Sequence, residues 1–178
     1  MATEALWQLG LDRVVLVPAG VPPHKPDGPH LPAALRARLV EAAVAGEPGL
    51  AMSSIELERP GPSFTADTLE ALAAAEPGAR LWFLLGADQL ARLRSWRDPE
   101  RIVRAARLAI APRAGTDRPQ AERLAAELAP GRADWLRIPL IGVSSSMIRA
   151  RMAAGEPVRR LVPPAVEDLL RQEGLVPS

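Results

Sequence analysis

The chain has no cysteine and only two histidines among its 178 residues. Without cysteine, disulfide bonds and thiolate metal sites are excluded, and two histidines are too few for an ordinary zinc site. No run of about eighteen apolar residues is present, nor is a basic start followed by an apolar stretch. We therefore expect a cytoplasmic protein without a membrane anchor, a signal peptide or a resident metal.

An excess of charge of either sign is also missing. The formal net charge is +1, whereas binding to nucleic acids or membrane surfaces depends on concentrated positive charge. The sequence contains no G-x-G-x-x-G motif, no Walker A loop and no Ser/His/Asp set, so hydride transfer and triad hydrolysis lose support. The expected partners are small molecules. Nothing in the sequence indicates an oligomeric state.

Short apolar runs alternate with amphipathic segments along the whole chain. Because the runs are apolar throughout, they are typical of buried parallel strands, which we expect at 14–17, 50–57, 81–85, 108–111 and 135–141. Helices are expected at 2–10, 33–45, 66–75, 99–106, 117–129, 144–154 and 163–173, with a short one around Leu90 and Leu93. This alternation predicts one α/β domain over residues 1–178, a Rossmann-like doubly wound parallel sheet with helices on both faces.

Polar residues follow several of these strands, at the edge where such sheets bind ligands. Gly86 and Asp88 come directly after the strand at 81–85; Asp88 could accept hydrogen bonds from a ribose or cap the next helix. Arg113 follows the strand at 108–111, where an arginine is poorly placed for the core and suits an anion. His24 and Lys25, the only lysine, lie in a long loop at 19–32, where they could contact a phosphate or remain solvated.

Three serines stand between the last strand and the helix that follows it. One serine is enough to cap a helix, so Ser144, Ser145 and Ser146 exceed that need. A helix N-terminus attracts anions, and Arg149 in the first turn carries a guanidinium suited to a phosphate. The stretch predicts a phosphate cradle, with a capped helix and a surface arginine as the alternative.

A second group of residues suits an aromatic, acidic ligand. Trp96 lies in a polar turn and could stack on a ring, whereas Trp7, Trp82 and Trp135 are expected to pack. Thr65 is expected to cap a helix, and the turn Ser63-Phe64-Thr65 presents backbone N–H groups to any carboxylate nearby.

In their order and spacing, these motifs resemble those of the bacterial nicotinate-mononucleotide adenylyltransferases, of the nucleotidylyltransferase superfamily. The resemblance implies transfer of AMP from ATP to nicotinate mononucleotide, which releases pyrophosphate and yields deamido-NAD for NAD biosynthesis, with Mg²⁺ accompanying ATP. The matching segments are Val21-Pro22-Pro23-His24-Lys25, Ser63-Phe64-Thr65-Ala66-Asp67-Thr68, Gly86-Ala87-Asp88 with Trp96, Arg113-Ala114-Gly115, and Ser144-Ser145-Ser146-Met147-Ile148-Arg149.

The resemblance also implies a role for each matching residue. His24 and Lys25 would be catalytic and reach the reacting phosphates. ATP would be bound by Gly86, Asp88, Ser144, Ser145, Ser146 and Arg149. Nicotinate mononucleotide would be bound by Phe64, Thr65, Trp96 and Arg113.

The chain departs from this family in one respect. The family opens with a strand, a Gly-Gly-x-Phe loop and an H-x-G-H motif, and none of these is among the 178 residues. We expect the first, central strand of the sheet to be missing between the strands at 14–17 and 81–85, which would leave two unpaired inner edges and an impaired ATP site. The hypothesis that follows is a natural protein that starts upstream of Met1. The alternatives are an adenylyltransferase with another acceptor, nicotinamide mononucleotide or a phosphopantetheine, and an inactive nucleotide-binding protein.

Overall fold

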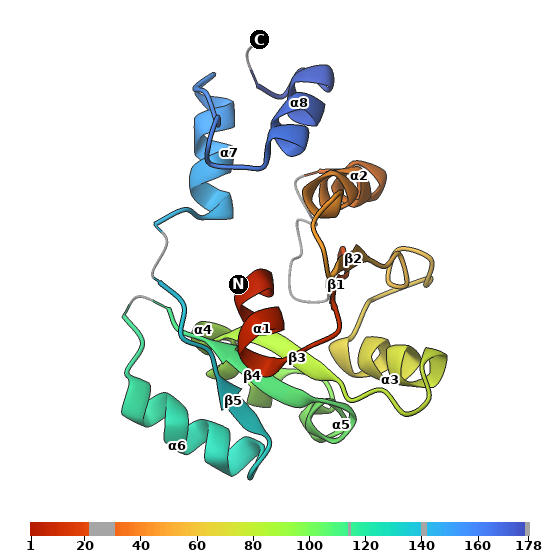
Figure 1. The fold of residues 1–178 in the computed structure, drawn as a ribbon, viewed down its shortest axis with the longest axis vertical. Helices are drawn as coiled ribbons and strands as arrows, with labels where there is room; N and C mark the ends of the chain where they lie inside the picture. The colour runs from red at the N-terminus through yellow and green to blue at the C-terminus, as the bar shows by residue number, and fades with distance from the viewer. Residues whose placement is uncertain (22–30, 114, 140–141, 177–178) are drawn as a thin grey trace.

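The strands form two separate parallel sheets (Figure 1). The computed structural model describes residues 1–21, 31–113, 115–139 and 142–176. In the first sheet β1 (Val14–Leu16) pairs with β2 (Leu50–Met52). In the second, β3 (Trp82–Gly86), β4 (Arg107–Ala111) and β5 (Ala133–Trp135) lie in that order. The prediction of parallel strands is therefore confirmed.

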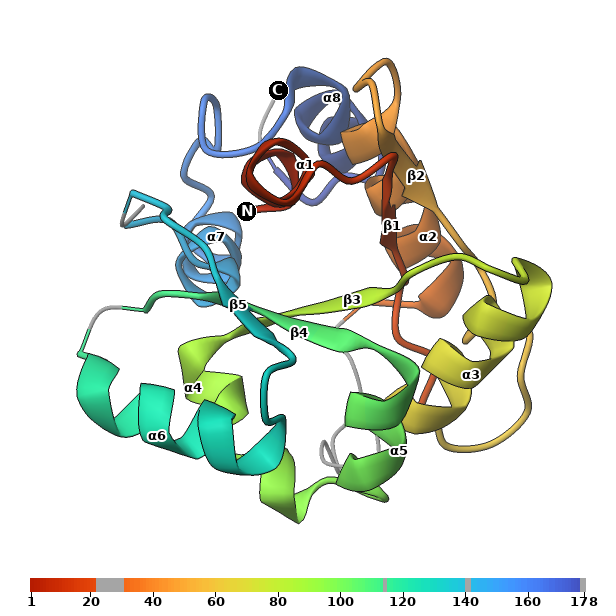
Figure 2. The same ribbon diagram turned by 60° about the horizontal axis from the view of Figure 1, so that its bottom comes forward.

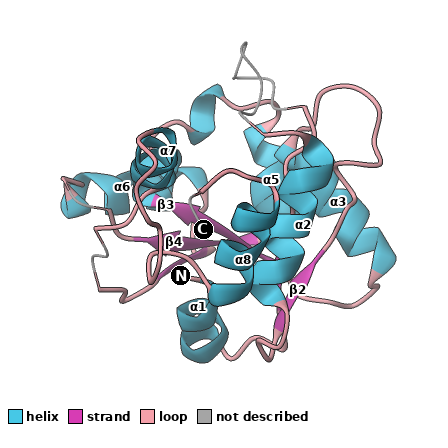
Figure 3. Cartoon of the chain, turned by 90° about the horizontal axis from the view of Figure 1, so that it is seen from above, coloured by secondary structure: helices cyan, strands magenta, loops and turns pink. Residues whose placement is uncertain are grey.

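Helices flank the three-stranded sheet on both sides. In Figure 2, α4, α5 and α6 lie below it and α1 lies above it, whereas α7 packs with α2 and α8. Figure 3 shows how helices predominate around the strands. This is the Rossmann-like α/β arrangement expected from the sequence. The helices are α1 (Ala2–Leu9), α2 (Ala33–Val44), α3 (Thr65–Ala75), α4 (Ala87–Leu90), the 3₁₀ turn η1 (Leu93–Ser95), α5 (Pro99–Ala105), α6 (Arg118–Leu128), α7 (Ser145–Ala153) and α8 (Pro164–Gln172).

Two strands are shorter than predicted. β2 ends at Met52, because the chain turns within two residues and the Leu57 N–H donates to the Ser54 carbonyl. β5 occupies 133–135 rather than 135–141, since its register pairs Ala133 with Leu108 and the partner strand β4 ends soon after. The ends of a strand are thus decided by its partner, which periodicity does not reveal.

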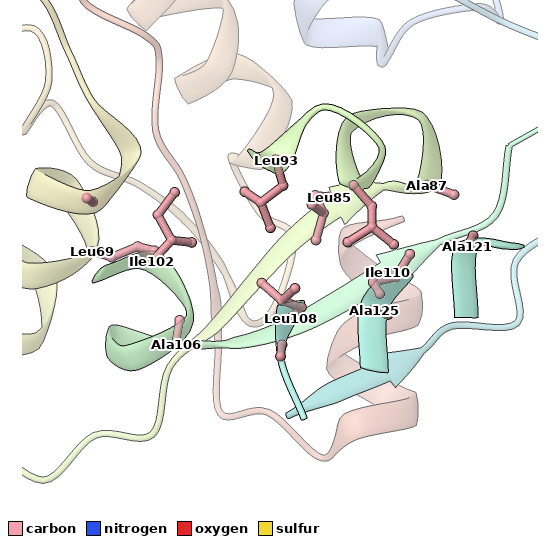
Figure 4. Packing of buried hydrophobic residues seen from close by; sticks show 13 residues of the cluster. Leu69, Leu85, Ala87, Leu93, Ile102, Ala106, Leu108, Ile110, Ala121 and Ala125 are labelled. Carbon is pink, nitrogen blue, oxygen red and sulfur yellow. The ribbon is translucent and has the colours of Figure 1, made fainter. Parts of the chain in front are cut away.

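The main hydrophobic core lies between the three-stranded sheet and the helices α3 to α6. Leu108 and Ile110 of β4 are fully buried there, against Ile102 of α5 and Leu93 of η1 (Figure 4). A second cluster joins α2, α7 and α8 around Val158 and Leu170. The two clusters together bury the apolar faces that the sequence pattern predicts.

A groove of about 860 Å³ separates the two sheets. Its walls include 14–17, around β1, and 81–84, in and before β3, and α1 and α3 also contribute. β1 is hydrogen-bonded only to β2, and β3 only to β4, within the described ranges. The expectation of two unpaired inner edges at these strands is confirmed.

Helix α1 has one face toward this groove and one toward solvent. Ala5 is buried and lines the groove, and Gly10 ends the helix with a φ of 59°, as a C-cap glycine does. Trp7 lies on the other face and is 80% exposed, so the prediction that it packs is wrong. Trp82 and Trp135 are half-buried as predicted. None of the described helices has the length and apolar character to cross a membrane.

One ion pair ties the three strands of the larger sheet together. Arg107 of β4 donates to both carboxylate oxygens of Asp134 in β5, at 2.9 and 3.0 Å. The indole N–H of Trp82 in β3 donates to the same carboxylate at 2.8 Å. These two donors hold the pKa of Asp134 below its usual range, with Arg107 the larger cause and partial burial opposing it.

We expect Asp134→Asn to lower the free energy of unfolding by about 1–2 kcal/mol at pH 7, because it removes a bidentate charged pair. A lowered carboxyl pKa contributes stability above the pKa of the unfolded chain, about 4, and loses it as the pH falls through the folded value. The difference between wild type and variant should therefore shrink between pH 7 and about pH 3. Urea unfolding at several pH values measures it. Asp168→Asn, at an exposed pair with Arg171, is the control and should change little. A difference that is independent of pH would contradict the assignment.

Candidate functional site

Two of the predicted site residues meet at the carboxyl ends of β3 and β4. The Arg113 Nε lies 3.4 Å from Asp88 Oδ1, and both side chains are about half exposed. Gly86 makes this possible, since a Cβ at that position would lie 2.3 Å from Asp88 Oδ1 and 3.1 Å from Arg113 Nε. Asp88 does not cap a helix: α4 has Gly86 as its N-cap, with Asp88 in its first turn. An ion pair therefore stands at the ligand-binding edge of the sheet.

The serine turn combines a helix cap with exposed polar groups. Ser144 is the N-cap of α7 and accepts from the Met147 N–H at 3.2 Å. Ser146 Oγ accepts from the Arg149 guanidinium at 3.1 Å, and the three serines and Arg149 are exposed. The capping alternative explains Ser144 alone. Ser145, Ser146 and Arg149 leave hydroxyls and a guanidinium at a helix N-terminus, accessible to an anion.

The turn before α3 ends differently from the prediction. Phe64 is the N-cap and Thr65 is the first helical residue, so Thr65 as N-cap is wrong. The reason is that the Phe64 carbonyl accepts the Thr68 N–H and begins the helix one residue earlier. Among the described residues, no side chain caps this N-terminus. The backbone N–H groups of the first turn therefore point out of the helix without a side-chain acceptor.

Trp96 stands near this turn and is half-buried. Its ring contacts Phe83 of β3 edge to face, with centroids 5.9 Å apart and planes at 62°. It also packs against the main core. Trp96 therefore has a packing role in addition to the stacking role predicted for it.

A charged network that the sequence analysis missed joins the Trp96 turn to α3. Arg101 of α5 donates to Asp67 at 2.8 Å and to Glu70 at 2.5 and 2.9 Å, and pairs with Asp98 at 3.2 Å. The hydrogen bond from Arg101 lowers the pKa of Glu70, and these carboxylates raise the pKa of Arg101. The i, i+3 spacing of Asp67 and Glu70 places both acids on one face of α3, which could have indicated a shared basic partner. The sequence did not reveal that partner, because Arg101 lies more than thirty residues away.

The backbone after β1 is held from two sides, also by residues that sequence reasoning missed. Arg36 of α2 donates to the carbonyls of Ala19 and Gly20, and to that of Leu31 at 3.3 Å. On the other side, the Glu56 carboxylate accepts from the Gly20 N–H at 3.4 Å. His24 and Lys25 fall between these anchors, at 22–30, and lie outside the described residues.

Glu56 also reaches the first turn of α3. It accepts from the Thr68 hydroxyl at 2.8 Å, and Arg59 donates to the same hydroxyl at 3.2 Å. The neighbouring Ser63 hydroxyl is buried and has no hydrogen-bond partner among the described residues. Across the described ranges, no three acidic or histidine side chains gather to hold a metal ion.

Comparison with known proteins gives consistent results. Residues 1–151 match the cytidylyltransferase-like family. The probable nicotinate-nucleotide adenylyltransferase of Synechococcus sp. (strain JA-3-3Ab) is 39% identical over 98% of this chain and 85% of the relative. That of Chromobacterium violaceum is 40% identical over 98% and 89%.

Solved structures show the same fold. Nicotinic acid mononucleotide adenylyltransferase of Plasmodium falciparum, complexed with NaAD, superposes with a TM-score of 0.72 at 15% identity, over 97% of this chain and 86% of that one. The same enzyme complexed with APC gives 0.74, also at 15% identity, over 98% and 88%. At this identity the likeness concerns the fold.

We expect Gly86→Ala to impair ligand binding far more than folding. The added methyl group displaces the Asp88 carboxylate, which is the mobile end of a side chain. The free energy of unfolding should therefore fall by about 1 kcal/mol or less. The KM for ATP should rise about tenfold, because the ion pair at the sheet edge is lost. Thermal unfolding and steady-state kinetics measure both effects. Gly142→Ala is the matched control, since its Cβ would meet no described residue within 4 Å. Equal behaviour of the two variants would refute this role of Gly86.

Proposed function

The chain belongs to the cytidylyltransferase-like family, and within it to the nicotinate-nucleotide adenylyltransferases, and we propose that the residues described above carry out that reaction. The enzyme transfers AMP from ATP to nicotinate mononucleotide and releases pyrophosphate. The product, deamido-NAD, is a precursor in NAD biosynthesis. The reaction is a nucleotidyl transfer, which fits a site rich in anion-binding groups.

The observation that supports this assignment best is the Asp88–Arg113 pair at the end of β3 and β4. In the proposed complex, Asp88 accepts hydrogen bonds from the ATP ribose, and Arg113 contacts the mononucleotide. Gly86 lets the chain approach the nucleotide closely. Because the two side chains are already in contact, the pair would mark the boundary between the two substrates.

The triphosphate would lie on the serine turn. Ser144, Ser145 and Ser146 offer hydroxyls at the N-terminus of α7, and Arg149 supplies a full positive charge. A phosphate oxygen of the mononucleotide attacks the α-phosphorus of ATP, and the bond to the β-phosphate breaks as pyrophosphate leaves. No covalent enzyme intermediate is needed. Catalysis therefore consists of aligning two anions and neutralising their charge.

The acceptor would lie between Trp96 and the turn before α3. The pyridine ring would stack on Trp96, and its carboxylate would accept from backbone N–H groups at Phe64 and Thr65. His24 and Lys25 are proposed to contact the reacting phosphates; they belong to the segment that the structure does not describe. Mg²⁺ is proposed to enter with ATP, since the described side chains form no acidic cluster that would hold it as a resident ion.

Two further assignments remain proposals. Residues 1–178 would act as one domain, and the site of action would be the cytoplasm. The alternative acceptors considered from the sequence were nicotinamide mononucleotide and a phosphopantetheine. The uncapped N-terminus of α3 favours the acid, because it attracts a carboxylate more than a neutral amide. The 860 Å³ groove between β1 and β3 supports the expectation of an impaired ATP site in these 178 residues. Binding of ATP without formation of dinucleotide would instead favour an inactive nucleotide-binding protein.

We expect Ser146→Ala and Arg149→Ala to lower kcat/KM for ATP by about ten- to a hundredfold. Each substitution removes a group that contacts a phosphate or that positions such a group. Both residues are exposed, so unfolding free energies should change by less than about 0.5 kcal/mol. Release of pyrophosphate and formation of deamido-NAD are measured together. Arg123→Ala, at an exposed arginine of α6, is the control and should leave turnover unchanged. If the variants lose stability in proportion to their loss of activity, the serine turn serves only as a helix cap and the proposed phosphate contacts are refuted.

A further inference from the structure

An arginine covers the aromatic ring at the start of α3. The guanidinium carbon of Arg97 lies 4.3 Å from the centroid of the Phe64 ring. Two other arginines stack in the same way, Arg118 on Trp135 at 3.8 Å and Arg80 on Trp82 at 5.7 Å. Arg97 differs from them because its ring partner is the N-cap of a helix whose first-turn N–H groups lack a side-chain acceptor.

The positive charge of Arg97 is only weakly neutralised by its neighbours. Among the described residues, the carboxylate nearest to it is that of Asp98, 3.7 Å from the Arg97 Nε, and this group is shared with Arg101 at 3.2 Å. Asp67 and Glu70, the acids on the adjacent face of α3, are both bonded to Arg101. The Arg97 side chain is 58% exposed, so its charge is accessible to a ligand at the N-terminus of α3.

The position of Arg97 is fixed by the backbone around it. Asp98 has a φ of 51°, which a non-glycine residue rarely adopts, and it is held there by Arg101. Arg101 in turn is bonded to Asp67 in the first turn of α3. Trp96, on the other side of Arg97, is fixed against Phe83. The Trp96–Asp98 turn and the start of α3 therefore form one unit.

We propose that Arg97 is a specificity-determining residue that makes this site prefer a pyridine carboxylate over the corresponding amide. The inference rests on the proposed function, and it adds a side-chain charge to the backbone N–H groups assigned to the acceptor. Nicotinate and nicotinamide mononucleotides share the ribose, the phosphate and the cationic ring. They differ in one charge, so an added positive charge at the start of α3 acts on the difference between them.

The test is equilibrium binding of the two mononucleotides, followed by calorimetry or by tryptophan fluorescence. Wild type should bind the acid more tightly, and Arg97→Met should reduce the ratio of the two dissociation constants by about three- to tenfold, as expected for one partly screened charge. Arg97→Lys keeps the charge and should restore most of the ratio. Raising the salt concentration should reduce the ratio for wild type more than for Arg97→Met.

Arg118→Met is the matched control, because it removes a stacked arginine from another aromatic ring and should leave the ratio unchanged. If wild type prefers the acid and Arg97→Met retains the whole preference, the inference fails while the proposed function stands. It also fails if Arg97→Met weakens both ligands equally, which would indicate a packing role. If wild type binds neither mononucleotide, the proposed function fails together with the inference.

Discussion

The parallel pairing of β3 with β4 is the constraint on which the candidate site depends. The register places Gly86 opposite Ala111 as the last pair of residues. Asp88 and Arg113 each follow two residues later, so the two chains leave the sheet in step and their side chains meet. If the register of β3 against β4 slipped by one residue, side chains that now share a face of the sheet would lie on opposite faces. Asp88 and Arg113 would then be separated. Glycine at position 86 is part of the same constraint, because any side chain there would occupy the space of the Asp88 carboxylate.

The sheet itself is divided, and this division shapes the rest of the molecule. β1 and β2 are joined to the larger sheet by helices and by the walls of a groove, without backbone hydrogen bonds between the sheets in the described parts. Unpaired inner edges of a parallel sheet are unusual, since such strands normally have a neighbour on each side. The groove between the sheets is lined in part by α1 and α3, and Glu56, which also lines it, accepts from the Thr68 hydroxyl of α3. The proposed ATP and acceptor sites thus depend on side-chain contacts as much as on strand pairing.

The proposed acceptor side shows how charged networks position aromatic groups. Arg101 links α3 to α5. It also holds the Trp96–Asp98 turn beside these helices, because Asp98 is bonded to the same guanidinium. Trp96 then rests on Phe83, and Arg97 rests on Phe64. Each contact is small by itself, since exposed ion pairs contribute little to stability. Their combined effect is to hold the Trp96 ring, the N-terminus of α3 and the positive charge of Arg97 close together.

The amino-acid sequence by itself determined the α/β class, the parallel sheet, the positions of most helices and the candidate residues at the strand ends. It did so because uniformly apolar strands, helical periodicity and capping residues are local patterns. They can be recognised without knowing which distant residues pack against them. The resemblance of its motifs to the adenylyltransferase family predicted the missing strand between 14–17 and 81–85. Only the tertiary structure decided the ends of β2 and β5, the exposure of Trp7, the contact of Asp88 with Arg113 and the network of Arg101. These depend on which residues distant in sequence become neighbours, and strand register and side-chain packing decide that only when the whole chain has folded.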